Sequence, residues 1–289
     1  MKTKMKFRII SFAFILLTCC FQNAYAGFPV EKGDWMISPM YSHYSARNYW
    51  NNLKVTTPYI KGGSFTSNYF GLYGVFGIEK NINFVFNIPY IIQTYSDSVS
   101  YAKTASMGDA TVGIAYYFKN DNPYKHVSLT GSLIIPLYQN IVLPTSSSSV
   151  TPPYAGFQTL GIEAKLGFSG TNMEVLKYTY YDVEGGLRQY LASSGPTQGF
   201  FNATFGVPLN KDWKLAGTIS GVTSSSGNSS LISTSTSTVN KDYGYLRFTL
   251  AAGYNISPGA SIWGNIFTDV SGRSIGEGSG FSIFAVFKF

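Results

Sequence analysis

The sequence predicts an all-β fold: a transmembrane, antiparallel, up-and-down β-barrel of about 12 strands that follows a cleaved signal peptide. Three observations lead to this prediction: a secretory signal, long segments in which apolar residues alternate with small or polar ones, and an aromatic C-terminal strand. Charged residues make up 12% of the 289 residues and aromatic residues 17%. Because a soluble domain usually has about 25% charged residues, we expect much of the surface to face a non-aqueous environment.

The N-terminus has the layout of a secretory signal peptide. Four basic residues lie between Lys2 and Arg8, residues 9–17 are apolar, and the small residues Ala24 and Ala26 suit a signal peptidase. The apolar stretch is too short to cross a bilayer as a helix. We therefore expect residues 1–26 to be a signal peptide and residues 27–289 to form an outer-membrane β-barrel.

Both cysteines, Cys19 and Cys20, lie within this signal. The mature chain would then have no thiol for a disulfide, a metal site or nucleophilic catalysis. A lipoprotein signal with one of these cysteines as the lipidation site is the alternative, although Thr18 or a second cysteine before the lipidated residue fits that motif poorly. Removing the signal leaves 17 basic residues against 14 acidic ones. So small an excess argues against nucleic-acid binding.

Alternation is clear in residues 107–119 and 246–256, where apolar residues occupy one parity and small or polar residues the other. In a strand the two sets point to opposite faces. These segments are longer than the strands of about 5–6 residues typical of globular proteins and match the length of about 9–11 residues that a membrane strand needs. Twelve such segments are expected, at residues 34–45, 64–78, 82–95, 107–119, 125–138, 156–169, 175–190, 199–208, 212–223, 243–256, 260–270 and 279–289.

The predicted connections alternate in length, with short turns such as 79–81 and long ones such as 271–278. Outer-membrane barrels have short periplasmic turns and long outer loops, so an even strand number places both termini on the periplasmic side. Residues 145–153 and 223–239 are rich in Ser and Thr. Such tracts bury little apolar surface, and we expect mobile surface loops, with a receptor or adhesin epitope as the alternative.

Apolar residues of the last segment, from Phe281 through Phe287 to Phe289, fall on one face, and Phe289 is the final residue. This pattern resembles the terminal strand that the barrel-assembly machinery recognises in outer-membrane proteins. Hydrocarbon offers no partner for backbone polar groups, so a spanning sheet must close on itself. We therefore expect a Gram-negative outer-membrane location, with membrane lipid and the assembly machinery as partners. Tyrosines near strand ends, such as Tyr95 and Tyr117, would suit interfacial girdles.

Charged residues within the strands define the candidate lumen. A Lys or Arg facing lipid at mid-depth would cost about 2–4 kcal/mol, so we expect these side chains to point inward. A salt-bridge network that braces the barrel is the simpler interpretation, and a role in guiding a solute is the alternative. The candidates are Asp109, Glu163, Lys165, Asp182, Glu184, Arg188 and Arg247.

The sequence gives little support for catalysis, and we expect neither an enzyme nor a cofactor. The two histidines, His43 and His126, fall at opposite ends of the predicted barrel, which argues against a zinc site. Barrel lipases and deacylases need a His and a Ser close together near the outer leaflet. Only His43 is placed for such a role, so a barrel enzyme built on His43 is the alternative. A soluble β-sandwich is a further alternative.

Residues 77–90, with the strand end Ile88-Pro89-Tyr90, and residues 107–113 resemble the family called MetA-pathway of phenol degradation. The resemblance covers roughly 40 residues and implies a transporter-like outer-membrane barrel. It suggests a passive channel or uptake protein for small, hydrophobic or aromatic solutes. The alternative is a non-conducting surface protein whose Ser/Thr-rich loops mediate interactions. The first strand starts about seven residues after the cleavage site, which leaves no sequence for an N-terminal plug like those of fatty-acid and toluene channels.

Overall fold

The structure is a computed structural model that describes residues 28–119, 122, 124–139, 153–172, 178–192, 195–226 and 241–289. The expected signal peptide lies outside the described residues, as do most of the two Ser/Thr-rich tracts, residues 145–152 and 227–239. No helix in the described ranges is long and apolar enough to cross a membrane.

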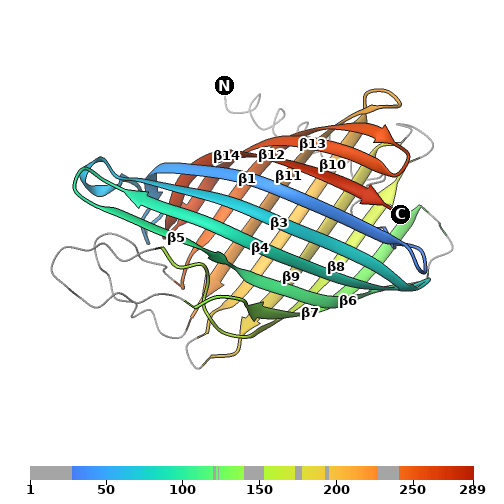
Figure 1. Ribbon diagram of the computed structural model, residues 1–289, viewed down its shortest axis with the longest axis horizontal. Helices are drawn as coiled ribbons and strands as arrows, with labels where there is room; N and C mark the ends of the chain where they lie inside the picture. The colour runs from blue at the N-terminus through green and yellow to red at the C-terminus, as the bar shows by residue number, and fades with distance from the viewer. Residues whose placement is uncertain are drawn as a thin grey trace, which may run out of the picture.

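The described chain is almost entirely β-structure (Figure 1). Its elements are β1 (Trp35–Trp50), β2 (Thr56–Pro58), the 3-10 helix η1 (Ile60–Gly62), β3 (Ser64–Glu79), β4 (Ile82–Ser96), β5 (Tyr101–Met107), β6 (Asp109–Tyr117), β7 (Lys125–Pro136), β8 (Gly161–Thr171), β9 (Tyr180–Tyr190), β10 (Thr197–Pro208), β11 (Trp213–Ser225), β12 (Gly244–Ser257), β13 (Ala260–Arg273) and β14 (Ile275–Lys288). Among these, β2 and β5 are short additions, and the other twelve strands form the barrel.

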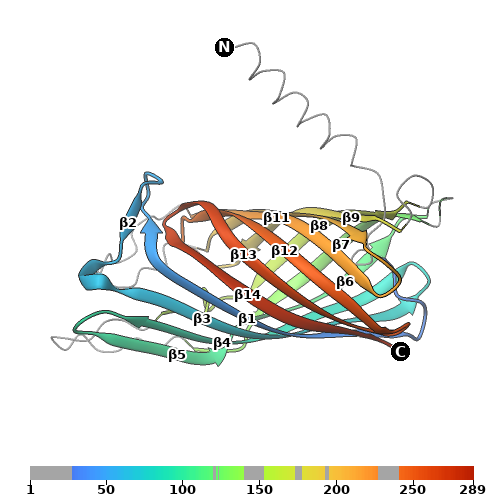
Figure 2. The ribbon, with the colours of Figure 1, turned by 90° about the horizontal axis from the view of Figure 1, so that it is seen from above.

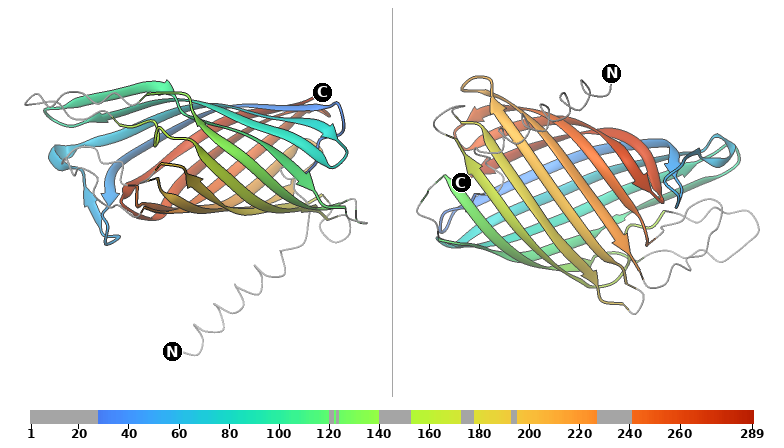
Figure 3. Two further views of the ribbon diagram at one scale, coloured as in Figure 1. Left: turned by 90° about the horizontal axis from the view of Figure 1, so that it is seen from below. Right: turned by 180° about the vertical axis from the view of Figure 1, so that it is seen from behind.

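The twelve strands pair antiparallel with their neighbours along the chain, and β14 returns to pair with β1. This closure confirms the predicted transmembrane up-and-down barrel. The strands run obliquely around the wall (Figure 3), and the β1–β2 and β4–β5 hairpins extend beyond the barrel at one end (Figure 2). Trp35 and Phe289 exchange backbone hydrogen bonds at the opposite end. We call that end the periplasmic rim, after the orientation expected from the sequence.

Each predicted segment overlaps one barrel strand, and the differences lie mainly at the outer end. β1 continues beyond residue 45 to Trp50, β5 forms within the expected loop 96–106, and Ser274 alone separates β13 from β14 where a loop over 271–278 was expected. That last prediction was wrong because the small polar residues there belong to strands. At Gly272, for example, the Trp50 ring packs where a Cβ would lie, so only glycine fits at this position.

The outer surface of the wall is apolar. Large aliphatic side chains face outward, such as Leu187 (65% exposed) and Ile266 (64% exposed), and aromatic residues lie at two levels. A surface of this kind fits the apolar band and aromatic girdles of a membrane barrel and would be unstable in water. The exposed aromatic residues near the periplasmic rim include Trp35, Tyr116, Phe168, Trp213, Tyr254 and Phe287, and those farther up the wall include Phe70, Tyr90, Phe201, Phe248 and Phe281.

The residues before β1 do not leave the barrel freely. Asn83, which is fully buried, accepts a hydrogen bond from the Val30 backbone N–H (3.0 Å) and donates one to the Val30 carbonyl (2.9 Å). The Phe28 ring packs edge-on against His126 with centroids 4.7 Å apart. Residues 28–31 thus cross the inward face of several strands at the periplasmic rim. These few residues line one rim of the lumen, and the expectation that no sequence remains for an N-terminal plug stays a prediction.

Candidate functional site

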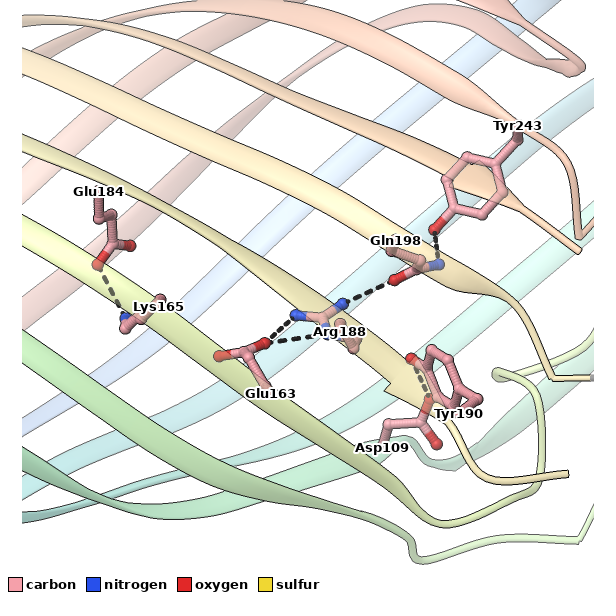
Figure 4. A network of polar contacts seen from close by, with 8 residues as sticks. All are labelled: Asp109, Glu163, Lys165, Glu184, Arg188, Tyr190, Gln198 and Tyr243. Carbon is pink, nitrogen blue, oxygen red and sulfur yellow. Dashed lines mark hydrogen bonds and ion pairs between the residues drawn. The ribbon is translucent and has the colours of Figure 1, made fainter.

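The candidate site is the inner surface of the barrel, and its best-defined part is the pair formed by Glu163 and Arg188. The two residues lie directly opposite each other on β8 and β9. Arg188 donates to the Glu163 carboxylate from Nε (3.0 Å) and from Nη2 (2.6 Å), as Figure 4 shows. Charge-assisted pairs with two donors are strong and geometrically specific. The neighbouring residues Ile162 and Leu187 are exposed on the opposite, outer face.

A chain of further contacts fixes the Arg188 guanidinium. Its Nη1 donates to Gln198 Oε1 (3.1 Å), and Gln198 Nε2 donates in turn to the Tyr243 hydroxyl (3.0 Å; Figure 4). The guanidinium also lies 5.3 Å from the centre of the Phe200 ring. Arg188 is thus held by two hydrogen-bonding partners and one ring, which fixes the position of its guanidinium.

Asp109 is near the Arg188 network but makes different contacts. Its carboxylate accepts hydrogen bonds from the hydroxyls of Tyr138 (2.8 Å) and Tyr190 (3.4 Å). Asp109 belongs to β6 and Tyr190 to β9, so this contact passes over β7 and β8 on the inside of the barrel. Burial raises the pKa of Tyr138 above its ordinary range, so its hydroxyl keeps the proton that it donates. Phe157, in the segment after β7, packs against the Tyr190 ring.

Two more ion pairs include the remaining basic candidates. Lys165 lies 2.8 Å from Glu184, as Figure 4 shows, and Arg247 binds Asp269 through Nε (2.7 Å) and Nη2 (3.2 Å). Arg247 also lies over the Phe267 ring, 4.3 Å from its centre. Five of the seven sequence-based candidates therefore form separate ion pairs, whereas Asp109 and Asp182 form none within the described part of the chain.

Several residues of this inner surface were missed from the sequence. Asp269 faces Arg247 directly across β12 and β13, and it could have been found as a charge inside a predicted strand. Gln198 carries no charge and gave no signal, and Tyr243 was expected in an interfacial girdle, whereas its hydroxyl binds Gln198 inside the barrel. Tyr95 and Tyr117 are buried within the barrel, so their expected place in the interfacial girdles was wrong. Their rings point inward because both residues occupy the same alternate positions along their strands as the small and polar residues.

A cavity of about 200 Å³ lies on the part of the inner wall opposite to Lys165 and Glu184. Tyr73 on β3 is 37% exposed there, although it faces inward. The cavity is lined by Ser38, Met40, Gly71, Tyr73, Asn87 and Phe284.

The remaining candidates lie outside this network. Phe289 is exposed at the periplasmic rim, held by its backbone bonds to Trp35. His126 lies against Phe28 at the same rim, whereas His43 contacts Phe281 on the outer wall. Within the described ranges, no group of three or more His, Cys, Asp or Glu side chains is placed to hold a metal ion.

Comparison with solved structures shows the fold. An outer-membrane channel from Pseudomonas putida F1 superposes with a TM-score of 0.71 at 11% identity, over 92% of this chain and 99% of that chain. The translocator domain of the autotransporter NalP from Neisseria meningitidis scores 0.49 at 14% identity, over 90% of each chain. The NanC porin scores 0.48 at 9% identity, over 88% of this chain and 98% of that one. No family model and no curated protein matches the sequence.

Proposed function

We propose that this protein is a passive outer-membrane channel that takes up small hydrophobic or aromatic solutes. The observation that carries the proposal is the cavity of about 200 Å³ beside Tyr73, inside a closed barrel. The sequence resemblance to the MetA-pathway of phenol degradation family points to the same class. So does the shared fold with a protein described as an outer-membrane channel.

The lining of the cavity suits a single aromatic ring that carries a polar group. Met40, Tyr73 and Phe284 offer apolar and aromatic surface, and Ser38 and Asn87 offer hydrogen-bonding groups. Ligand sites are commonly apolar, with a few polar groups that fix the orientation of the ligand. A phenol-sized molecule would fill this space. The ion pair of Lys165 and Glu184 on the facing wall would give the molecule a polar neighbour on its open side.

The test is the conductance of the refolded, signal-free protein in a planar bilayer, with and without phenol. We expect discrete current steps that phenol reduces. Tyr73→Ala should raise the conductance and weaken the block, because it widens the lumen at the cavity. Leu72→Ala, its outward-facing neighbour, should change neither. Bilayers that stay silent after insertion has been verified would contradict the proposal and favour a non-conducting surface protein with interacting Ser/Thr-rich loops.

The proposed location is the Gram-negative outer membrane, with its lipid as the surrounding partner. Phe289, exposed at the end of β14, supports a role as the residue that the barrel-assembly machinery reads. Phe289→Ala should lower the amount of assembled barrel in the outer membrane while leaving in vitro refolding unchanged. Equal amounts of assembled barrel for the wild type and Phe289→Ala would contradict this role.

A further inference from the structure

A polar cluster lies on the lipid-facing side of the barrel wall. His43 of β1 and Asn68 of β3 are directly opposite each other, and His43 Nδ1 is 2.9 Å from Asn68 Oδ1. The Tyr41 hydroxyl donates to the same oxygen at 2.9 Å. The His43 ring packs on Phe281, which is exposed on the outer wall. Polar side chains are costly on this surface, so a fixed His–Asn pair there requires an explanation.

The pair has the arrangement of a positioned general base. If Asn68 Oδ1 accepts both hydrogen bonds, Nδ1 of His43 carries the ring proton and Nε2 keeps its lone pair. A nucleophile, a histidine base and a third group that orients the base form the general design of hydrolytic triads. Asn68 supplies the orienting group in this cluster, and His43 supplies the base.

Ser45 is placed to be the nucleophile. It is two residues beyond His43 on β1, so both side chains project from the same face, with Cα atoms about 7 Å apart. Ser45 and His43 are not hydrogen-bonded in the resting structure, and such bonds often tighten only when substrate binds. A β-bulge between Ala46 and Asn48 follows immediately. Bulges re-aim nearby side chains and leave one residue outside the ladder.

The depth of Ser45 matches the ester bonds of membrane lipids. Ser45 is ten residues beyond Trp35, the first residue of β1. With a rise of about 3.3 Å per residue and a tilt of about 40°, it stands about 25 Å above the periplasmic rim. The apolar band of such barrels is about 25 Å tall. Ser45 therefore lies where outer-leaflet hydrocarbon meets the head groups, which is the level of acyl ester carbonyls.

An apolar groove of about 630 Å³ on the outer wall leads to this cluster. Small residues such as Gly217 and Gly264 form its floor, and Leu250, Ile266 and Phe281 are among its larger lining residues. Directly paired residues form one row across the strands, which climbs the wall because the strands are tilted. The row runs through Phe205, Gly217, Leu250, Ile266, Phe281, His43 and Asn68. An acyl chain in the groove would present its ester at the upper end.

We propose that Ser45, His43 and Asn68 form a site that hydrolyses acyl esters of membrane lipids. Ser45 Oγ attacks the ester carbonyl carbon while His43 Nε2 takes the hydroxyl proton. The carbon–oxygen bond to the alcohol breaks, and His43 returns the proton to that alcohol. Water, deprotonated by the same base, then cleaves the acyl-serine ester and releases a fatty acid. Asn68 is a positioning residue that holds the His43 ring.

The test uses the purified full chain in mixed micelles of detergent and phosphatidylcholine. Two signals are followed: fatty-acid release and covalent labelling by a fluorescent fluorophosphonate. We expect Ser45→Ala to abolish both signals and His43→Ala to lower the hydrolysis rate by about 100-fold or more. Ser279→Ala is the matched control, since Ser279 lies directly opposite Ser45 on β14, and it should leave both signals unchanged.

Asn68 variants separate positioning from folding. Asn68→Ala should lower hydrolysis, and Asn68→Asp should restore it, because a carboxylate can only accept the proton of Nδ1. Wild-type protein that is folded but neither labelled nor active would overturn the proposal, as would equal labelling of the Ser45→Ala variant. Conductance should be the same in wild type and Ser45→Ala, so this proposal can fail while the channel function stands.

Discussion

At the residue scale, the inner wall is organised around arginines that each bind a carboxylate and pack over an aromatic ring. Arg188 engages Glu163, Gln198 and the Phe200 ring. The Glu163 side chain is only 10% exposed, whereas Glu184 in the neighbouring pair is 29% exposed. A carboxylate that loses its cation is more costly where water cannot replace the lost contacts.

This difference predicts unequal effects of two matched substitutions. Arg188→Ala should lower the free energy of unfolding by about 1–3 kcal/mol, because it leaves the Glu163 carboxylate unpaired. Lys165→Ala should cost less than about 1 kcal/mol, since Glu184 remains partly hydrated. Urea unfolding in lipid vesicles, followed by tryptophan fluorescence, measures both. Equal losses would show that burial does not set the strength of these pairs.

The charged candidates could be predicted from the sequence because a bilayer leaves such side chains only one favourable direction. Their partners could not all be predicted, since pairing depends on register between strands. Asp269 meets Arg247 because the register of the β12–β13 hairpin runs unbroken from Asn255 and Ser261 to this pair. Neutral partners such as Gln198 and Tyr243 have no charge that would restrict them to the inside. Tyr117 is a further case. Its position in the alternation indicates the inner face, whereas its aromatic character suggested a place in the lipid-facing girdle.

At the scale of elements, single polar side chains fix two segments at opposite ends of the barrel. These segments are the residues before β1 and the β4–β5 turn. Residues 28–31 are held at the periplasmic rim by the paired hydrogen bonds of Asn83. Gly77 permits this approach, because the Glu31 carbonyl lies where a Cβ would stand. The sequence indicates only the length of this segment, and the buried asparagine that anchors it has no signature outside the folded structure.

Releasing this segment should widen the periplasmic opening. We expect Asn83→Ala to increase single-channel conductance, because both bonds to Val30 are lost and residues 28–31 can leave the wall. Asn255→Ala is the control, since Asn255 donates to the Lys211 carbonyl (3.0 Å) in a turn near the same rim and has no bond to the segment. Unchanged conductance in Asn83→Ala would show that residues 28–31 do not limit the current.

The β4–β5 turn should depend on pH. Asp97 Oδ1 accepts hydrogen bonds from the backbone N–H groups of Val99 and Ser100, both at 2.8 Å. These bonds, the Val99 bond most of all, hold the pKa of the Asp97 carboxyl below its ordinary value of 3.8. A lowered pKa in the folded state means that the stabilisation is complete above pH 3.8 and is lost as the pH falls through the folded value.

Hydrogen exchange at Val99 and Ser100, corrected for the intrinsic pH dependence, measures this loss. Protection of these two amides should fall below pH 3.8 in the wild type. In Asp97→Asn, which has no titrating carboxyl, protection should stay constant with pH. A fall of the same size in both proteins would show that another group controls the turn.

At the scale of the whole molecule, closure by twelve strands could be predicted because the bilayer imposes it. A spanning sheet has to satisfy its own backbone groups, and the resulting alternation is visible in single segments such as residues 246–256. The outer end is less constrained, since water can satisfy the backbone there. This explains why β5 and the short Ser274 connection differ from the expected loops.

Closure also brings the inward charges into one lumen, where their balance should set ion selectivity. Arg188, Lys165 and Arg247 are each neutralised by an acidic partner. Asp109 and Asp182 have no ion-pair partner within the described part of the chain. At a pH where both are ionised, these two carboxylates should favour cations at their level of the lumen.

The reversal potential in a KCl gradient tests this balance. At about pH 9 we expect Asp182→Asn to shift the reversal potential toward that of chloride, because the substitution removes one negative charge from the lumen. Glu79→Gln is the control, because Glu79 pairs with Lys32 on the exposed rim and its charge is screened by salt. Equal reversal potentials in the wild type and in Asp182→Asn would show that this carboxylate does not act on the permeating ions.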